Sequence, residues 1–366
     1  MIDMNKYSKT LRYSVRSMFF IFSFIYILFF QKVLIETYLE VYSSSANGLS
    51  RTLFLAILLS TVLTLISIPV DKIFKFSDGL FACSFLPSAI LLGICTSFSN
   101  MNGKQFSVGI WILIAVVTIL FMIVCKVLSV RKFSRGVDIN SLYANNFLIM
   151  VYAVFCTLII GNTEETLHRT LSMEKYYEHG RYEKVLEVGK NAEEINTDIS
   201  VLRAKSLSKL NVGEAIPGSQ LGDHLFEYKQ SGPNIVADTL QSMGAHDNSL
   251  EKANRKLAAL LLRKNLNEFS DGLQDDLINV LKISSWHPDN MPLYYLQALI
   301  LAEYKGYAIP QEMDELYPQQ SKEVRDLFAE YIKDKETVYS QSKQYRSNYM
   351  YKKYSRTYWW FYDFSE

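Results

Sequence analysis

Acidic residues stand close to histidines at several places in this sequence, and such pairs could support acid–base or metal chemistry. Glu164, Glu165 and His168 are spaced so that they share one face of a helix. A Glu-x-x-His pair is half of a di-metal carboxylate site, which also needs a second pair and two further glutamates. The sequence supplies neither. A solvated helix face next to a membrane is therefore the favoured interpretation.

Other histidines also have local explanations. Asp223-His224 could suggest acid–base work, but no nucleophile motif accompanies the pair. His246-Asp247 precedes the start of a helix, and His287 lies in the turn WHPDN. HExxH, GxSxG, Walker and dinucleotide-glycine motifs are absent. We therefore predict no catalytic residue, no metal site and no cofactor, and an enzyme is the less favoured class.

Charge divides the chain into two halves. Residues 1–163 contain thirteen Lys or Arg and six Asp or Glu, which gives a net charge of +7. Residues 164–366 contain twenty-five Lys or Arg and thirty-one Asp or Glu, which gives a net charge of −6. All four cysteines lie in the first half, and the second half therefore has no disulfide and no thiolate metal site. This division predicts a membrane domain joined to a soluble domain. The acidic second half argues against a nucleic-acid partner, because phosphate backbones bind basic faces.

Five apolar segments have roughly the length of about twenty residues that crosses a bilayer. They lie at about 15–35, 52–70, 80–98, 108–130 and 146–160, and Pro87 falls inside the third. Lys and Arg gather in the N-terminal tail and in the loops after the second and fourth segments. The positive-inside rule then predicts a cytoplasmic N-terminus and an extracytoplasmic second half. If the third or fifth segment did not span, the second half would be cytoplasmic instead.

The second half changes to amphipathic helices with polar turns. In MEKYYEHGRYEKVLEVGKNAEEI, at 173–195, apolar residues recur at helical spacing around Gly180, which can stop a helix in the left-handed conformation. Gly180, Tyr182 and Ala192 resemble the turn and packing positions of a tetratricopeptide repeat (TPR), although Val185 and Gly189 replace the usual Ala and aromatic residue.

Further likeness to this repeat appears around Gly213, which lies 33 residues after Gly180, and around Gly306-Tyr307. The resemblance covers about 164–213 and 272–310, and 214–247 is irregular. The expected fold is all-α, with a bundle of about five transmembrane helices in 1–163, a TPR-like domain in 164–337 and an aromatic tail or closing helix in 338–366. Such repeats imply a concave groove for a peptide or a partner helix.

The segment YKKYSRTYWWFYDFSE, at 351–366, is dense in aromatic residues. It has three interpretations: a helix that closes the stack, an anchor at the membrane interface, or a docking peptide for a partner. TYWWFY, at 357–362, also resembles the terminus of bacterial multi-pass membrane proteins that carry TPR-like helices.

These patterns predict a scaffold in a bacterial inner membrane whose periplasmic TPR-like domain binds a protein partner. One alternative is a membrane enzyme or accessory subunit acting on envelope polymers or lipid-linked substrates, with Glu164, Glu165 and His168 near its site. The second alternative is a transporter component. It is less favoured, because the centres of the apolar segments hold no Asp, Glu, Lys, Arg or His.

Overall fold

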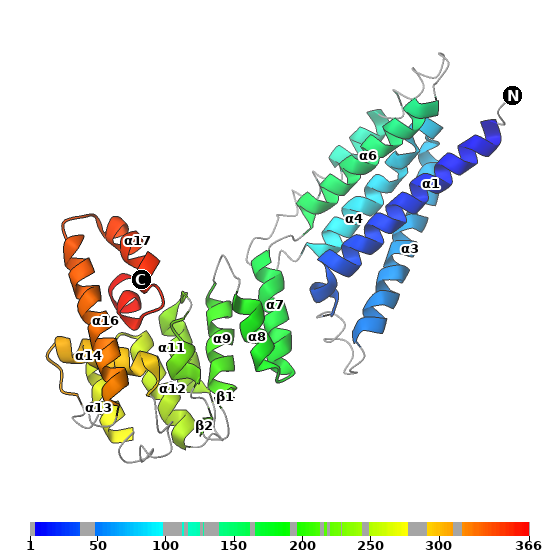
Figure 1. Cartoon of the computed structure of the whole chain (residues 1–366). Coiled ribbons are helices and arrows are strands. Elements are labelled where there is room, and N and C mark those ends of the chain that lie inside the picture. Colours follow the sequence, from blue (N-terminus) through cyan, green and yellow to red (C-terminus); the bar gives the residue numbers. More distant parts are fainter. Residues whose placement is uncertain are drawn as a thin grey trace. The chain divides into compact units, whose positions relative to one another are not determined.

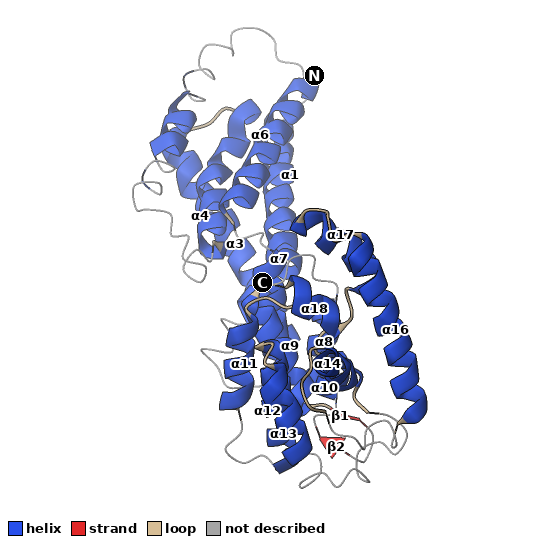
Figure 2. Cartoon of the chain, turned by 90° about the vertical axis from the view of Figure 1, so that its left-hand side faces the viewer, coloured by secondary structure: helices blue, strands red, loops and turns tan. Residues whose placement is uncertain are grey.

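The computed structural model of this chain is helical and separates into two compact units, Met1–Glu165 and Thr166–Glu366 (Figure 1). The residues that it describes are 4–36, 48–97, 112, 116–124, 127, 139–161, 165–190, 196–212, 216–217, 220–227, 229–243, 249–276, 291–309 and 317–365. Figure 2 shows how completely helices dominate both units. The described strands are the two-residue pair β1 (Asn211–Val212) and β2 (Ile216–Pro217), which the sequence pattern did not predict.

The first unit contains helices α1 (Met4–Ile25), α3 (Gly48–Phe74), α4 (Leu86–Thr96) and α6 (Ile139–Ile160). A π-helical turn, η1 (Tyr26–Phe30), continues α1, and a 3₁₀ helix, η2 (Asp78–Phe85), leads into α4. Among the described residues, four segments are long and apolar enough to cross a membrane: Tyr7–Phe30, Arg51–Phe74, Asp78–Thr96 and Asn140–Ile160. The expected fourth segment, 108–130, lies largely outside the described residues, although 116–124 are helical.

The segment Asp78–Thr96 lies at the centre of the first unit. Of the residues in its apolar window 67% are buried, against 22–28% in the other three segments. Its helix is not continuous, because Leu80 departs from helical geometry and Pro87 stands in the first turn of α4 rather than inside a long helix. A proline is tolerated there, since the first turn lacks internal acceptors for its N–H groups.

Side-chain hydrogen bonds compensate for the irregular backbone of η2. The Asn146 side chain of α6 accepts from the Ala82 N–H at 2.8 Å and donates to the Asp78 carbonyl at 2.7 Å. At the same end of the unit, Arg12 forms ion pairs with Asp71 at 2.8 Å and with Asp78 at 2.9 Å. In an apolar surrounding, unsatisfied backbone groups would be costly, so these contacts explain why a broken helix persists there.

The second unit is a succession of helices, most of which pack on a neighbour in the chain (Figure 1). Its helices are α7 (Glu165–Glu178), α8 (Tyr182–Lys190), α9 (Thr197–Lys209), α10 (Gln220–His224), α11 (Pro233–Ser242), α12 (Ser249–Leu262), α13 (Leu266–Asp276), α14 (Leu293–Tyr304), α16 (Pro318–Thr337), α17 (Lys343–Tyr354) and α18 (Tyr358–Phe364). Contacts run from α8 through α9, α11, α12, α13, α14 and α16 to α17. Short α10 and α18 pack back against α14.

Three helices of this unit stop in the same way. After α7, α12 and α14, the residues Gly180, Lys264 and Gly306 adopt left-handed backbone angles, with φ of 68°, 60° and 83°. In each case the N–H of that residue and the N–H of the next one donate back to the last turn. This is the Schellman arrangement, which satisfies carbonyls left open at a helix end. The predicted left-handed Gly180 is confirmed, whereas Gly213 and Ala192 lie outside the described residues.

Candidate functional site

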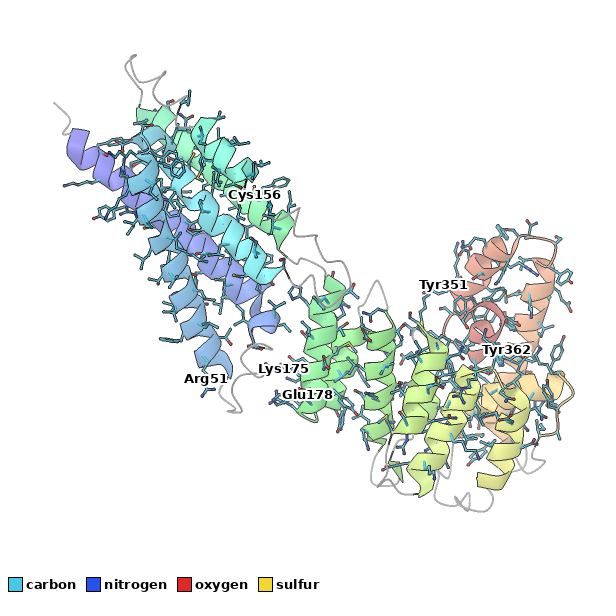
Figure 3. All side chains as sticks on the ribbon, turned by 180° about the vertical axis from the view of Figure 1, so that it is seen from behind. Arg51, Cys156, Lys175, Glu178, Tyr351 and Tyr362 are labelled. Atoms are coloured by element: carbon cyan, nitrogen blue, oxygen red, sulfur yellow. The ribbon has the colours of Figure 1, made fainter. Side chains whose placement is uncertain are left out.

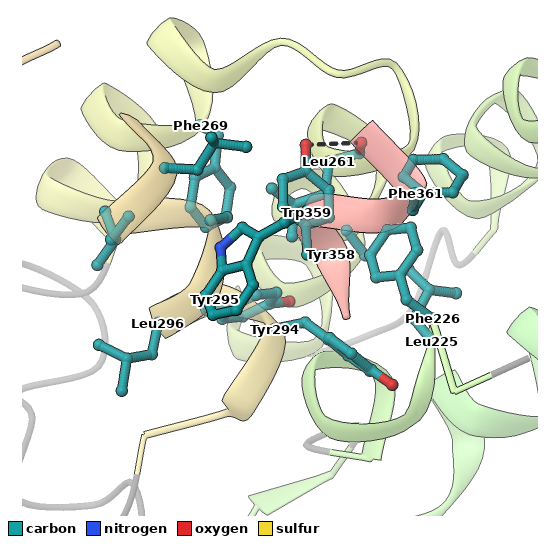
Figure 4. Packing of buried hydrophobic residues seen from close by; sticks show 14 of the residues in the cluster. Leu225, Phe226, Leu261, Phe269, Tyr294, Tyr295, Leu296, Tyr358, Trp359 and Phe361 are labelled. Carbon is teal, nitrogen blue, oxygen red and sulfur yellow. Dashed lines mark hydrogen bonds between the residues drawn. The ribbon is translucent and has the colours of Figure 1, made fainter. Parts of the chain in front are cut away.

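The aromatic segment 358–364 forms helix α18, which lies inside the second unit. Tyr358 and Trp359 have no exposed surface and belong to the large hydrophobic core of this unit (Figure 4). The Trp359 indole N–H donates to the carbonyl of Gln297 at 2.8 Å, and the Gln297 side-chain oxygen accepts from the Tyr358 N–H at 2.8 Å. The structure therefore shows that α18 packs on the other helices of the second unit, which is one of the three interpretations of the tail.

Polar contacts hold the other side of α18. The Tyr331 hydroxyl of α16 donates to the Trp359 carbonyl at 3.2 Å and to the Asp363 carboxylate at 2.5 Å. Lys335 forms an ion pair with the same carboxylate. Burial, together with the charge of Asp363, raises the pKa of Tyr331 well above its ordinary value, so this hydroxyl is a permanent donor at neutral pH.

Lys264 connects the end of α12 to the end of α18. Its Nζ donates to the Ser365 carbonyl at 2.6 Å and lies 5.4 Å from the centre of the Phe361 ring. Burial lowers the pKa of this lysine, and the nearby Asp363 opposes that effect. The left-handed conformation found here is normally taken by glycine, because it strains the backbone of other residues. The side-chain contacts of Lys264 offset this strain.

A groove with a volume of about 610 Å³ lies beside α18. One wall is the segment 229–232 before α11, and the other is formed by α17 and α18. Its described lining residues are Phe226, Lys229, Gln230, Ser231, Gly232, Gln344, Ser347, Asn348, Tyr351, Ser355, Trp360, Phe361, Phe364 and Ser365. The volume falls within the range of about 300–1,000 Å³ that is typical of ligand sites.

One wall of the groove is held in place. The Ser231 N–H donates to the Ser200 hydroxyl of α9 at 3.0 Å, and the buried Gln230 side chain donates to the Leu225 carbonyl. Gly232 has a φ of 61°, and a Cβ at this position would lie 2.8 Å from Thr197, so only glycine fits here. Contacts within the protein therefore fix the wall at 229–232.

The opposite wall combines aromatic rings with amides and hydroxyls. The Trp360 indole N–H donates to the Ser347 carbonyl at 3.4 Å, and the Tyr351 ring meets the Trp360 ring edge to face at 5.2 Å. Tyr351, which is labelled in Figure 3, is 49% exposed, whereas Trp360 is 8% exposed. Lys229 is the charged residue among the described lining residues, and these include no carboxylate. Such a surface suits a polar, extended ligand with hydrogen-bonding groups and some apolar area.

The acidic and histidine residues of the sequence take separate local roles. Among the described residues, no group of three or more His, Cys, Asp or Glu is arranged to hold a metal ion. Asp223 accepts from the Leu293 N–H at 2.9 Å and so caps α14, and His224 lies 3.2 Å from the Glu227 carboxylate. Glu165 and His168 lie on α7 and are not among the described residues that line the groove. Glu164, His246, Asp247 and His287 lie outside the described residues.

The resemblance to a repeat fold implied a groove, but the position of the groove beside α18 and its lining residues were not predicted from the sequence. Gln344, Ser347, Asn348, Tyr351 and Ser355 are spaced at three or four residues and so share a helix face, which is a signal that the printed sequence contains. The partner wall at 229–232 could not be found in this way, because it comes from an irregular segment more than a hundred residues earlier. Comparisons with protein-family models, curated proteins and solved structures found no match for this chain.

Proposed function

We propose that this chain is a membrane-anchored scaffold whose second unit, a TPR-like stack of helices, binds an extended segment of a protein partner on the extracytoplasmic side. The groove beside α18 carries this proposal. Its aromatic rings, amides and hydroxyls match the alternating apolar and hydrogen-bonding surface of an extended peptide. The four apolar helices of the first unit support membrane anchoring.

The chemistry of the lining narrows the class of peptide. Lys229 supplies a positive charge, and the described lining residues offer no negative charge. A neutral or acidic segment with serine, threonine, amide or aromatic side chains is therefore the best match, since like charges across an interface disfavour binding. The extracytoplasmic side is inferred from the distribution of Lys and Arg in the loops, together with five crossings that include the segment 108–130.

Site-specific photo-crosslinking in intact cells tests the groove. A photoreactive amino acid replaces Asn348, which lines the groove, and in a matched strain it replaces Asp326, an exposed residue of α16 outside the groove. We expect one discrete protein adduct from position 348 that is absent at position 326. Equal adducts at both positions, or no adduct at 348, would contradict the proposal.

The topology has its own test. A reporter that is active only in the cytoplasm is joined to Glu366, and the same reporter joined before Met4 serves as the positive control. We expect activity from the second fusion alone. Activity from both fusions would place the helical stack in the cytoplasm and reject the extracytoplasmic part of the proposal. Peptide binding by the groove would still be decided by the crosslinking experiment.

A further inference from the structure

One exposed side of the α17 segment carries tyrosines and cations at helical spacing. Tyr345, Tyr349 and Lys352 follow one another at intervals of four and three residues, so they lie along one side of the helix, and Arg356 stands in the turn that follows it. Tyr345 is 52% exposed and Tyr349 is 43% exposed, and their rings stack with centres 6.4 Å apart. We call these four residues the tyrosine–basic stripe.

The stripe is not needed to hold α17 in place. The buried residues of this helix are Met350 and Tyr354, which point into the core of the second unit. Tyr354 also donates to the Asp334 carboxylate of α16 at 2.7 Å. The exposed tyrosines therefore require an explanation other than packing, because two large rings side by side at a surface leave apolar area in water.

The charges of helix α17 itself have one sign. Helix α17 contains four basic residues and no acidic residue. The two carboxylates that reach α17 from α16, Glu330 and Asp334, are bound by Lys353, which lies outside the stripe. Lys352 and Arg356 are exposed and form no ion pair with another described residue. The stripe thus offers two uncompensated positive charges next to two stacked tyrosines.

We propose that the tyrosine–basic stripe docks on the anionic headgroups of a phospholipid bilayer. Tyrosine rings settle at the depth of the headgroups, and lysine and arginine are attracted by a negative membrane surface. The inference rests on the proposed membrane anchoring. Helix α6 ends at Ile160 and α7 begins at Glu165, so a chain anchored through the first unit keeps the second unit at a high effective concentration near lipid.

A lipid surface fits the stripe better than a second protein does. A stable protein interface buries about 800 Å² on each partner, which four side chains of one short helix do not provide. Lipid docking needs no such area. The transmembrane anchor tethers the second unit to the bilayer, so a weak contact between the stripe and lipid forms at a high effective concentration.

Lipid crosslinking of the full chain tests this inference. The chain is placed in nanodiscs of zwitterionic lipid, with or without a photoreactive phosphatidylglycerol, and crosslinked peptides are mapped by mass spectrometry. With the anionic probe, we expect adducts within 343–356. In the variant Lys352→Glu/Arg356→Glu they should fall by about tenfold, as loss of the charge attraction predicts. The variant Tyr345→Ser/Tyr349→Ser should give a smaller decrease.

A charge-matched variant separates the stripe from net charge. Lys322 and Lys333 are exposed residues of α16, and Lys322→Glu/Lys333→Glu changes the net charge by the same amount. This variant should retain the adducts of the unchanged chain. A thermal unfolding curve for each variant shows that the helices remain folded.

Several outcomes would overturn the inference. These are adducts on the apolar helices with none in 343–356, and adducts in 343–356 that persist in Lys352→Glu/Arg356→Glu. A chain that fails to enter nanodiscs rejects the membrane anchor, and the inference falls with it. A chain that enters them and labels only on its apolar helices rejects the stripe alone.

Discussion

Helices α17 and α18 are consecutive, and both are rich in aromatic residues, yet their surroundings are opposite. Helix α18 has the sequence YWWFYDF and is apolar on almost every side, so a stable position for it requires protein all around it. In α17, KQYRSNYMYKKY, polar and basic residues separate the rings, and only Met350 and Tyr354 face the core. The comparison teaches that spacing and polar neighbours, rather than aromatic content, decide which rings are buried.

The largest difference in stability between changes in α18 and changes in α17 should come from Trp359. The change Trp359→Ala removes a fully buried indole and its hydrogen bond to Gln297, and we expect a loss of about 3–5 kcal/mol of stability in the second unit. The matched change Tyr349→Ala should cost no more than about 0.5 kcal/mol, because Tyr349 is a surface residue outside the core. Hydrogen exchange of α12, α14 and α16 in the full chain measures both. Similar losses for the two variants would remove the distinction between the helices.

A smaller effect is expected at Gln297, which holds α18 through its side chain. In Gln297→Leu the buried Tyr358 N–H loses its acceptor at 2.8 Å, and an unsatisfied buried donor costs about 1–3 kcal/mol. The exposed Gln319 of α16 provides the control, since Gln319→Leu should leave stability unchanged within about 0.5 kcal/mol. Denaturant unfolding of both variants gives the difference. An unaffected Gln297→Leu would show that packing alone positions α18.

The smallest effect concerns the attachment of α17 to α16. The hydrogen bond from Tyr354, assisted by Lys353, lowers the pKa of Asp334 from its ordinary value of about 3.8. A carboxylate whose pKa is lowered on folding contributes fully above that ordinary value, and the contribution is lost as the pH falls through the lowered pKa. Because the Asp334 carboxylate is partly exposed to solvent, which screens its charge, we expect less than about 1 kcal/mol.

Acid titration of the variant Asp334→Asn checks this expectation. In the unchanged chain, exchange protection of α17 should decrease as the pH falls below the ordinary carboxylate pKa of about 3.8, and Asp334→Asn should show lower protection at neutral pH with a flatter acid profile. The variant Asp326→Asn changes an exposed carboxylate on the same helix and should retain the acid profile of the unchanged chain. An unchanged profile in Asp334→Asn would assign the acid response to other groups.

Local patterns predicted the parts of the fold that depend on neighbouring residues. Apolar length indicated the membrane-spanning candidates, and Gly180 indicated a left-handed helix stop. The broken segment Asp78–Thr96 was not predicted in its observed form, because the support for its irregular backbone comes from Asn146, far along the chain. A short-range pattern contains no information about that partner.

The candidate groove shows the same limit. The polar face of α17 is visible in the sequence, but its meaning depends on Gly232 and Ser231, which reach it only through tertiary packing. The position of α18 likewise depends on Gln297 and Tyr331, which lie 61 and 28 residues from their partners in this helix. Three interpretations of the aromatic segment therefore remained open until the packing was known.

The hydrogen bond from the Tyr358 hydroxyl to the Leu261 carbonyl, drawn in Figure 4, joins residues 97 positions apart. Stacked repeats whose contacts are limited to neighbours can open from one end, one repeat at a time. Helix α18 ties α12, α14 and α16 together, so these helices are expected to melt in a single cooperative transition. The same long loop must close before the core is complete, which makes folding of this region slower than its helical content suggests.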